Sequence, residues 1–127
     1  MVIAEQVKSA LREDRLRLAF QPIINCDTHE PLVWECLLRV VQPDGEVVAA
    51  AMFMSVVEEL GLIRQIDRRV LEMAVEVMVE YPDARPAINV SGLTSTDQTW
   101  PRHVVGLLSA HPQVAERMVV EITETAP

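Results

Sequence analysis

Hydrophobic and polar positions along the chain recur with two different periods, and each period predicts one type of element. Apolar residues three to four apart predict amphipathic helices, whereas alternation or a short apolar run predicts a strand. Helices are expected over residues 2–13, 50–60, 62–81 and 101–110. Strands are expected over residues 16–24, 32–41, 87–91 and 118–123. The order strand, strand, helices, strand, helix, strand is typical of a parallel α/β sheet.

Turn and stop signals separate these elements. A polar turn is expected over 25–31, a second turn at Pro43-Asp44-Gly45, and the end of a helix at Gly61. On the long helix over 62–81, Asp67 and its neighbours Arg68 and Arg69 are interpreted as a solvated face. We therefore expect one α/β domain over 1–127, with about four mainly parallel strands and flanking helices.

Composition and charge exclude several classes of protein. The 127 residues carry 19 acidic and 11 basic side chains, and this net charge of −8 argues against a nucleic-acid polymer as partner. Cys26 and Cys36 are too few for a disulfide framework or a four-ligand zinc site, so we expect free thiols in a reducing cytoplasm. The charge-free apolar run over 47–57 is about half the length of a spanning helix, so no membrane span is expected.

The end of the sequence leaves the predicted sheet open. The last predicted strand ends at Thr123, four residues before Pro127, and no helix follows to cover it. An unpaired apolar strand edge promotes aggregation. The expectation is that the chain continues in nature or that a second copy completes the sheet.

Three polar side chains interrupt apolar strands and are the candidates for chemistry. Glu35, Asn89 and Glu121 each lie within a run that is otherwise apolar. Burying a carboxylate without a partner costs several kcal/mol, so each glutamate needs compensation. Two carboxylates and an amide oxygen form a ligand set suited to Mg²⁺ or Mn²⁺. The alternative is that each glutamate is solvated at a strand end or paired with an arginine.

Strand parity adds a cationic group to this candidate site. Residues two and four apart on a strand share one face, so Glu35 and Arg39 point to the same side of the sheet. A cation and an arginine that face one pocket suit a phosphate-containing substrate.

Five sequence blocks in order, spread over residues 18–125, carry a family resemblance. They are Phe20-Gln21-Pro22-Ile23, Glu35-Cys36-Leu37-Leu38-Arg39, Phe53-Met54 through Glu58-Glu59-Leu60-Gly61-Leu62-Ile63, Ile88-Asn89-Val90-Ser91 and Glu121-Ile122-Thr123-Glu124. Together they resemble the EAL domain family, which comprises bacterial cyclic di-GMP phosphodiesterases and their catalytically silent relatives. Two departures are Cys36, where the family has alanine, and Val40, where tryptophan is frequent.

The resemblance implies a role for each matching residue. Glu35, Asn89 and Glu121 match metal ligands, with Mg²⁺ or Mn²⁺ as the implied cofactor. Gln21 and Arg39 match residues that contact the dinucleotide, Arg39 at a phosphate. Glu35 and Glu124 match catalytic glutamates, and Glu124 is linked to a loop of the active site rather than to direct metal ligation.

The resemblance also implies a fold and a question about activity. The family fold is a modified (β/α)₈ barrel of the TIM type, which typically needs about 250 residues, so this chain resembles its first half. The later strands of the family bring a paired aspartate motif, a lysine, a further glutamate and a glutamine. This sequence has no Asp-Asp pair, and its only lysine is Lys8.

Three functions therefore stay open at this point. The first is a metal-dependent phosphodiesterase domain that hydrolyses cyclic di-GMP to linear pGpG but is truncated here and inactive alone. The second is a non-catalytic module that binds cyclic di-GMP or a protein partner. The third is an interaction module completed by self-association as a homodimer. Whether a sensor or GGDEF domain accompanies the chain in a longer native protein is also left open.

Overall fold

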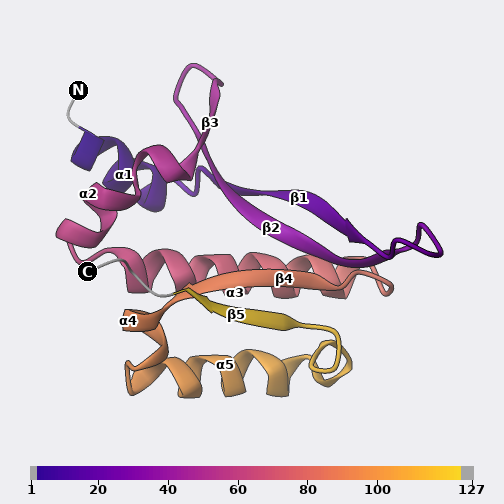
Figure 1. Ribbon diagram of the computed structural model, residues 1–127. Coiled ribbons are helices and arrows are strands. Elements are labelled where there is room, and N and C mark those ends of the chain that lie inside the picture. Colours follow the sequence, from indigo (N-terminus) through magenta and orange to yellow (C-terminus); the bar gives the residue numbers. More distant parts are fainter. Residues whose placement is uncertain (1–2, 124–127) are drawn as a thin grey trace.

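The computed structural model describes residues 3–123 of the chain (Figure 1). The strands are β1 (Leu16–Ile24), β2 (Pro31–Val41), β3 (Val47–Ala49), β4 (Pro86–Ser91) and β5 (Val119–Thr123). The α-helices are α1 (Ile3–Arg12), α2 (Met54–Glu59), α3 (Ile63–Glu80), α4 (Gly92–Ser95) and α5 (Thr99–Ala110), and the 3₁₀ turns are η1 (Ala50–Met52) and η2 (Pro112–Val114).

The described strands form one mixed sheet. Its order is β1-β2-β4-β5, and β3 pairs with the end of β2. The pairs β2–β4 and β4–β5 are parallel, whereas β1–β2 and β2–β3 are antiparallel. The expected α/β class is therefore confirmed, and the parallel part of the sheet is the part that carries β4 and β5.

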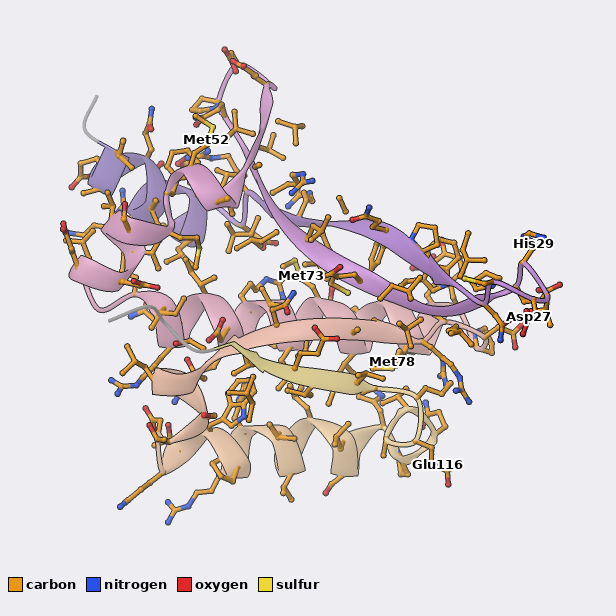
Figure 2. The ribbon with its side chains drawn as sticks, viewed as in Figure 1. Asp27, His29, Met52, Met73, Met78 and Glu116 are labelled. Atoms are coloured by element: carbon orange, nitrogen blue, oxygen red, sulfur yellow. The ribbon has the colours of Figure 1, made fainter. Side chains whose placement is uncertain are left out.

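The antiparallel hairpin of β1 and β2 follows from the length of the turn between them. Only residues 25–30 join the two strands, and a parallel connection needs a crossover of about a dozen residues or more. The turn closes with a backbone hydrogen bond from the Asn25 N–H to the Glu30 carbonyl. Figure 2 shows Asp27 and His29 at the far end of this hairpin.

The core lies between α3 and one face of the sheet. Ile88 and Val90 of β4 are almost fully buried, and α3 packs against this strand. Apolar residues of α3 are buried, among them Met73 and Met78 (Figure 2), as expected for the amphipathic helix predicted over 62–81. Alternation along the strands explains the arrangement, because every second side chain points toward α3.

The helix expected over 50–60 is divided in two. It consists of the 3₁₀ turn η1 and the short helix α2, and the buried Phe53 lies between them. Ala50, Phe53 and Val57 are nevertheless all buried at helical spacing, so the predicted apolar face is kept although the helix is divided. β3, α4 and η2 are short elements that the periodicity did not predict, because they span only three or four residues.

None of the helices in the described part of the chain combines the length and hydropathy needed to cross a membrane.

Candidate functional site

The parallel pairing of strands brings the three predicted ligand residues to one face of the sheet. Glu35 of β2 lies opposite Ala87 of β4, and Asn89 follows two residues later on the same face. Asn89 in turn lies directly opposite Glu121 of β5. The Asn89 Nδ2 donates a hydrogen bond of 3.4 Å to the Glu35 Oε1. Strands far apart in sequence therefore place two carboxylates and one amide in a row.

The residues expected to contact a substrate flank this row. Gln21 of β1 lies opposite Glu35 and is exposed. Arg39 lies four residues after Glu35 on the same strand, is half-buried, and donates from Nη1 to the Leu38 carbonyl. Glu124 lies outside the described residues.

The paired part of β2 and β4 is short, and a cavity lies beside the residues where the two strands are no longer paired. Their register extends only from Trp34–Pro86 to Glu35–Ala87. A cavity of about 220 Å³ lies beyond this point, and both Arg39 and Asn89 line it. Cys36, Ile66 and Asp67 also line it, so the cavity extends from Arg39 and Asn89 toward the core beneath α3.

The donor set fits a hard divalent cation in its chemistry. Carboxylate and amide oxygens are the groups that Mg²⁺ and Mn²⁺ prefer. Within residues 3–123, no three His, Cys, Asp or Glu side chains lie close enough to hold a metal, so the amide oxygen of Asn89 is needed for the set. Half a turn about the last side-chain torsion exchanges the oxygen and nitrogen of Asn89, and the amide can then present its oxygen to a cation beside Glu35.

Cys36, which stands where the resembled family has alanine, belongs to the core rather than to the site. Its side chain is 4% exposed and points to the face opposite Glu35. Burial, and secondarily the negative charge of Glu35, raises the pKa of the Cys36 thiol to about 11. The thiol stays neutral near neutral pH, so this substitution adds no charge to the site face. Val40, the second departure, is also buried.

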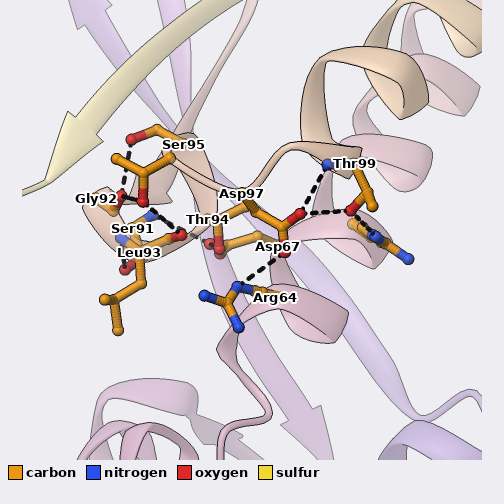
Figure 3. Close-up of polar contacts among 11 residues, drawn as sticks. Arg64, Asp67, Ser91, Gly92, Leu93, Thr94, Ser95, Asp97 and Thr99 are labelled. Carbon is orange, nitrogen blue, oxygen red and sulfur yellow. Dashed lines mark hydrogen bonds and ion pairs between the residues drawn. The ribbon is translucent and has the colours of Figure 1, made fainter.

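The interpretation of Asp67 as part of a solvated face is wrong. Asp67 is 5% exposed, and its Oδ2 accepts hydrogen bonds from the Thr94 hydroxyl at 2.6 Å and the Ser91 N–H at 3.1 Å (Figure 3). A helical signal for this was present in the sequence, since Asp67 falls within the apolar stripe between Ile63 and Val70 at a spacing of four and three residues. Asp67 also lines the cavity beside Asn89.

Comparison with known proteins identifies the family. The sequence profile of the EAL domain matches residues 4–127. The chain is 35% identical over 103 residues to an uncharacterised 76.5 kDa protein of Thiocystis violacea, which covers 78% of this chain. It is 28% identical over 129 residues to the cyclic di-GMP phosphodiesterase PdeF of Escherichia coli, which covers 98% of this chain.

The fold agrees with that of a solved member of the family. The crystal structure of the FimX EAL domain from Pseudomonas aeruginosa bound to c-di-GMP superposes with a TM-score of 0.84 at 28% identity over 96% of this chain. The match spans 50% of that chain, and the two curated relatives are matched over only 15% and 17% of their lengths. The expected fold class, the first half of the EAL barrel, is thereby confirmed. With the profile match over nearly its whole length, this chain belongs to the EAL domain family.

Proposed function

We propose that this chain supplies the cation- and substrate-contacting residues of β2, β4 and β5 for a cyclic di-GMP phosphodiesterase site. The observation that carries the proposal is the row of Glu35, Asn89 and Glu121 across three neighbouring strands. Two similar proteins support the proposal. PdeF is a cyclic di-GMP phosphodiesterase, and the FimX EAL domain was solved with c-di-GMP bound.

Each side chain has a distinct part in this proposal. Glu35, Asn89 and Glu121 hold a divalent cation, Mg²⁺ or Mn²⁺, through their oxygens. Such a cation, when bound, polarises a phosphoryl oxygen and lowers the pKa of a coordinated water. Arg39, four residues from Glu35 on the same face, neutralises a phosphate oxygen through its guanidinium.

Two further residues complete the proposed contacts. Gln21, exposed and opposite Glu35, offers an amide that can donate to and accept from the dinucleotide. Glu124 is assigned to the active-site loop on the family resemblance alone. The reaction is hydrolysis of one phosphodiester bond of cyclic di-GMP, which gives linear pGpG.

We infer that the chain alone binds cyclic di-GMP more readily than it hydrolyses this dinucleotide. The family's paired aspartates are absent from the sequence, and its only lysine, Lys8, lies on α1. Hydrolysis by two cations requires ligands for both and a means to activate water. The residues present suffice for one cation and for phosphate contact, which is a binding site without a complete catalytic apparatus.

The experiment measures binding and turnover on the same samples. The 127-residue chain is incubated with cyclic di-GMP and either Mg²⁺ or Mn²⁺, products are resolved by chromatography, and affinity is measured by titration calorimetry. Glu35→Gln removes one ligand charge at almost constant volume. Glu46→Gln, which changes an exposed glutamate in the turn before β3, is the matched control.

Three results distinguish the functions. Cation-dependent binding without pGpG, lost in Glu35→Gln and kept in Glu46→Gln, supports the proposal. Formation of pGpG that requires Glu35 supports the phosphodiesterase site and refutes the inference that the chain alone lacks turnover. Absence of both binding and turnover contradicts the proposed function for this chain and leaves the interaction module.

The interaction module, completed by a second copy, is the second candidate function. It rests on one observation, the exposure of apolar side chains on β5, with Val120 at 40% and Ile122 at 62%. A homodimer that pairs this strand would remove the edge from water.

A further inference from the structure

Asp67 is a charged side chain in an apolar setting. It lies on the face of α3 that carries the buried Ile63, Ile66 and Val70, and it is the one charged residue in the buried set of the described chain. Its Oδ2 accepts both the Thr94 hydroxyl and the Ser91 N–H (Figure 3).

The burial of this carboxylate is costly. Burial raises the pKa of Asp67, and the hydrogen bonds from Thr94 and Ser91 act in the opposite direction. A well-packed apolar side chain is often at least as stabilising as a buried charge at such a position. Core packing alone therefore does not explain an aspartate here, whereas its hydrogen bonds to the last residue of β4 and to Thr94 of α4 suggest a specific task.

That end of β4 lacks support from β2. The register between the two strands stops at Glu35–Ala87, and Asn89 is the second residue beyond it. On the other side, β4 remains paired with β5 through Asn89–Glu121. The Ser91 N–H, two residues after Asn89, finds its acceptor on α3 instead of on a strand. Asp67 thus contacts the part of β4 that is no longer paired with β2.

The connection to Asn89 is short. Asn89 reaches across the opened space to Glu35 with a long hydrogen bond of 3.4 Å. Its orientation therefore depends on how the backbone of β4 is held from Asn89 to Ser91. The Ser91 hydroxyl also caps α4 by accepting the Leu93 N–H, and Thr94 lies within that helix. One carboxylate accordingly ties α3 to both the last residue of β4 and the helix after it.

We propose that Asp67 is a positioning residue for the candidate site, which holds the junction of β4 and α4 so that Asn89 faces Glu35 and Glu121. The consequence for cation affinity rests on the proposed function, whereas the orientation of Asn89 does not. A residue of this kind orients a metal ligand without contacting the metal itself. Its removal typically weakens metal affinity by about 10- to 100-fold.

The test compares variants that keep or remove the acceptor. Asp67→Asn retains one oxygen that can accept from Thr94 and Ser91, whereas Asp67→Ala retains none. Thr94→Val removes one donor and leaves Asp67 in place. Thr96→Val is the matched control, because Thr96 is exposed at the end of α4 and its hydroxyl donates only to nearby carbonyls.

Three measurements are made on each variant with the full chain. Nuclear magnetic resonance records the side-chain amide signals of Asn89 and the exchange rate of the Ser91 N–H. Titration with Mn²⁺ alone gives the cation affinity, and thermal unfolding reports stability. We expect Asp67→Ala to shift the Asn89 signals, to speed Ser91 exchange and to weaken Mn²⁺ binding by about tenfold or more. Asp67→Asn should give values close to those of the wild type. Thr96→Val should equal the wild type in the resonance signals, the Mn²⁺ affinity and the unfolding temperature.

The proposal is overturned if Asp67→Ala unfolds at a lower temperature but keeps the wild-type Asn89 signals and Mn²⁺ affinity, because the residue would then serve stability alone. If Asp67→Ala does not fold, the Asn89 signals and the Mn²⁺ affinity are measured on Thr94→Val instead. Wild-type values in that variant would then overturn the proposal. If the wild type itself binds no Mn²⁺, the proposed function fails, and the Asn89 and Ser91 signals still decide whether Asp67 positions the strand.

Discussion

At the scale of single residues, side chains of one type have opposite environments in this chain. Cys26 is exposed in the turn between β1 and β2, whereas Cys36 is buried on β2. The thiolate is the reactive form of cysteine, and burial keeps the pKa of Cys36 at about 11. The two thiols should therefore differ greatly in reactivity.

We expect a thiol reagent such as Ellman's reagent, applied near neutral pH, to modify one thiol of the folded chain quickly. The second should react only after denaturant is added, since both access and ionisation of Cys36 are restricted. Cys26→Ser should abolish the fast phase, and Cys36→Ala should leave it unchanged. A fast phase that survives Cys26→Ser would contradict the burial of Cys36.

Asp97 provides a pH-dependent contact before α5. Its Oδ1 accepts hydrogen bonds from the Thr99 hydroxyl and the Thr99 N–H, both at 2.7 Å, and its Oδ2 pairs with Arg64. The Thr99 hydroxyl first, the Thr99 N–H next, and then Arg64 and Arg68 lower the pKa of Asp97 below its ordinary value of 3.8. A carboxyl with a lowered pKa stabilises the fold above its unfolded pKa, and this contribution is lost as the pH falls through the folded value.

We therefore expect Asp97→Asn to unfold at a lower temperature than the wild type at neutral pH. The difference should shrink as the pH falls below 3.8, the ordinary pKa, toward the lowered pKa at which Asp97 of the folded chain becomes protonated. Thermal unfolding followed by circular dichroism from about pH 7 to about pH 3 measures both. Asp27→Asn, in the exposed hairpin turn, serves as the control. A gap that is constant with pH would contradict a charge-dependent role.

At the scale of elements, the junction of α2 and α3 depends on a left-handed residue. Gly61 has φ of +69°, its N–H donates to the Glu58 carbonyl, and the Leu62 N–H donates to the Val57 carbonyl. These two bonds form a Schellman motif, which ends a helix and needs a residue that tolerates positive φ. The predicted helix end at Gly61 is thus confirmed together with its physical cause.

Two glycine substitutions should change stability in opposite directions. A Cβ meets no atom within 4 Å at either Gly61 or Gly106, so packing does not decide the outcome. Gly61→Ala should destabilise the fold by about 1 kcal/mol, because the left-handed conformation strains an L-residue. Gly106→Ala, within α5, should stabilise it by about 0.5–1 kcal/mol through helix propensity. Urea denaturation measures both, and changes of the same sign would contradict this account.

At the scale of the whole molecule, each end of the main strand order β1-β2-β4-β5 is an edge strand. Within the described residues, β1 pairs only with β2, and β5 pairs only with β4. Apolar side chains on both strands are exposed, among them Ile23 at 41% and Ile122 at 62%. Exposed strands of this kind pair with further strands when they can.

We expect the chain to self-associate as its concentration rises. Ile122→Lys should reduce the association, because a lysine on an edge strand opposes pairing. Val105→Lys is the matched control, since Val105 has the same exposure of 62% but lies on α5. Sedimentation velocity over a range of concentrations gives the mass. A wild type that remains monomeric at every concentration would contradict the homodimer and the interaction module that depends on it.

The sequence by itself determined the major elements and singled out the residues of the candidate site. The predicted helix over 62–81 is observed as Ile63–Glu80, and the strand over 87–91 as Pro86–Ser91. These two predictions succeeded because the local periodicity of apolar residues indicates which side of an element is buried. Glu35 and Asn89 could likewise be selected because a polar residue inside an apolar strand needs a partner.

Only the tertiary structure decided how these elements and residues meet. The opening between β2 and β4 and the contact of Asn89 with Glu35 both depend on strand pairing. The hydrogen bonds that Asp67 accepts from Thr94 and Ser91 depend on how α3 packs against β4 and α4. Periodicity reports that a face is buried but not what buries it, because pairing and packing join residues that are distant in the chain.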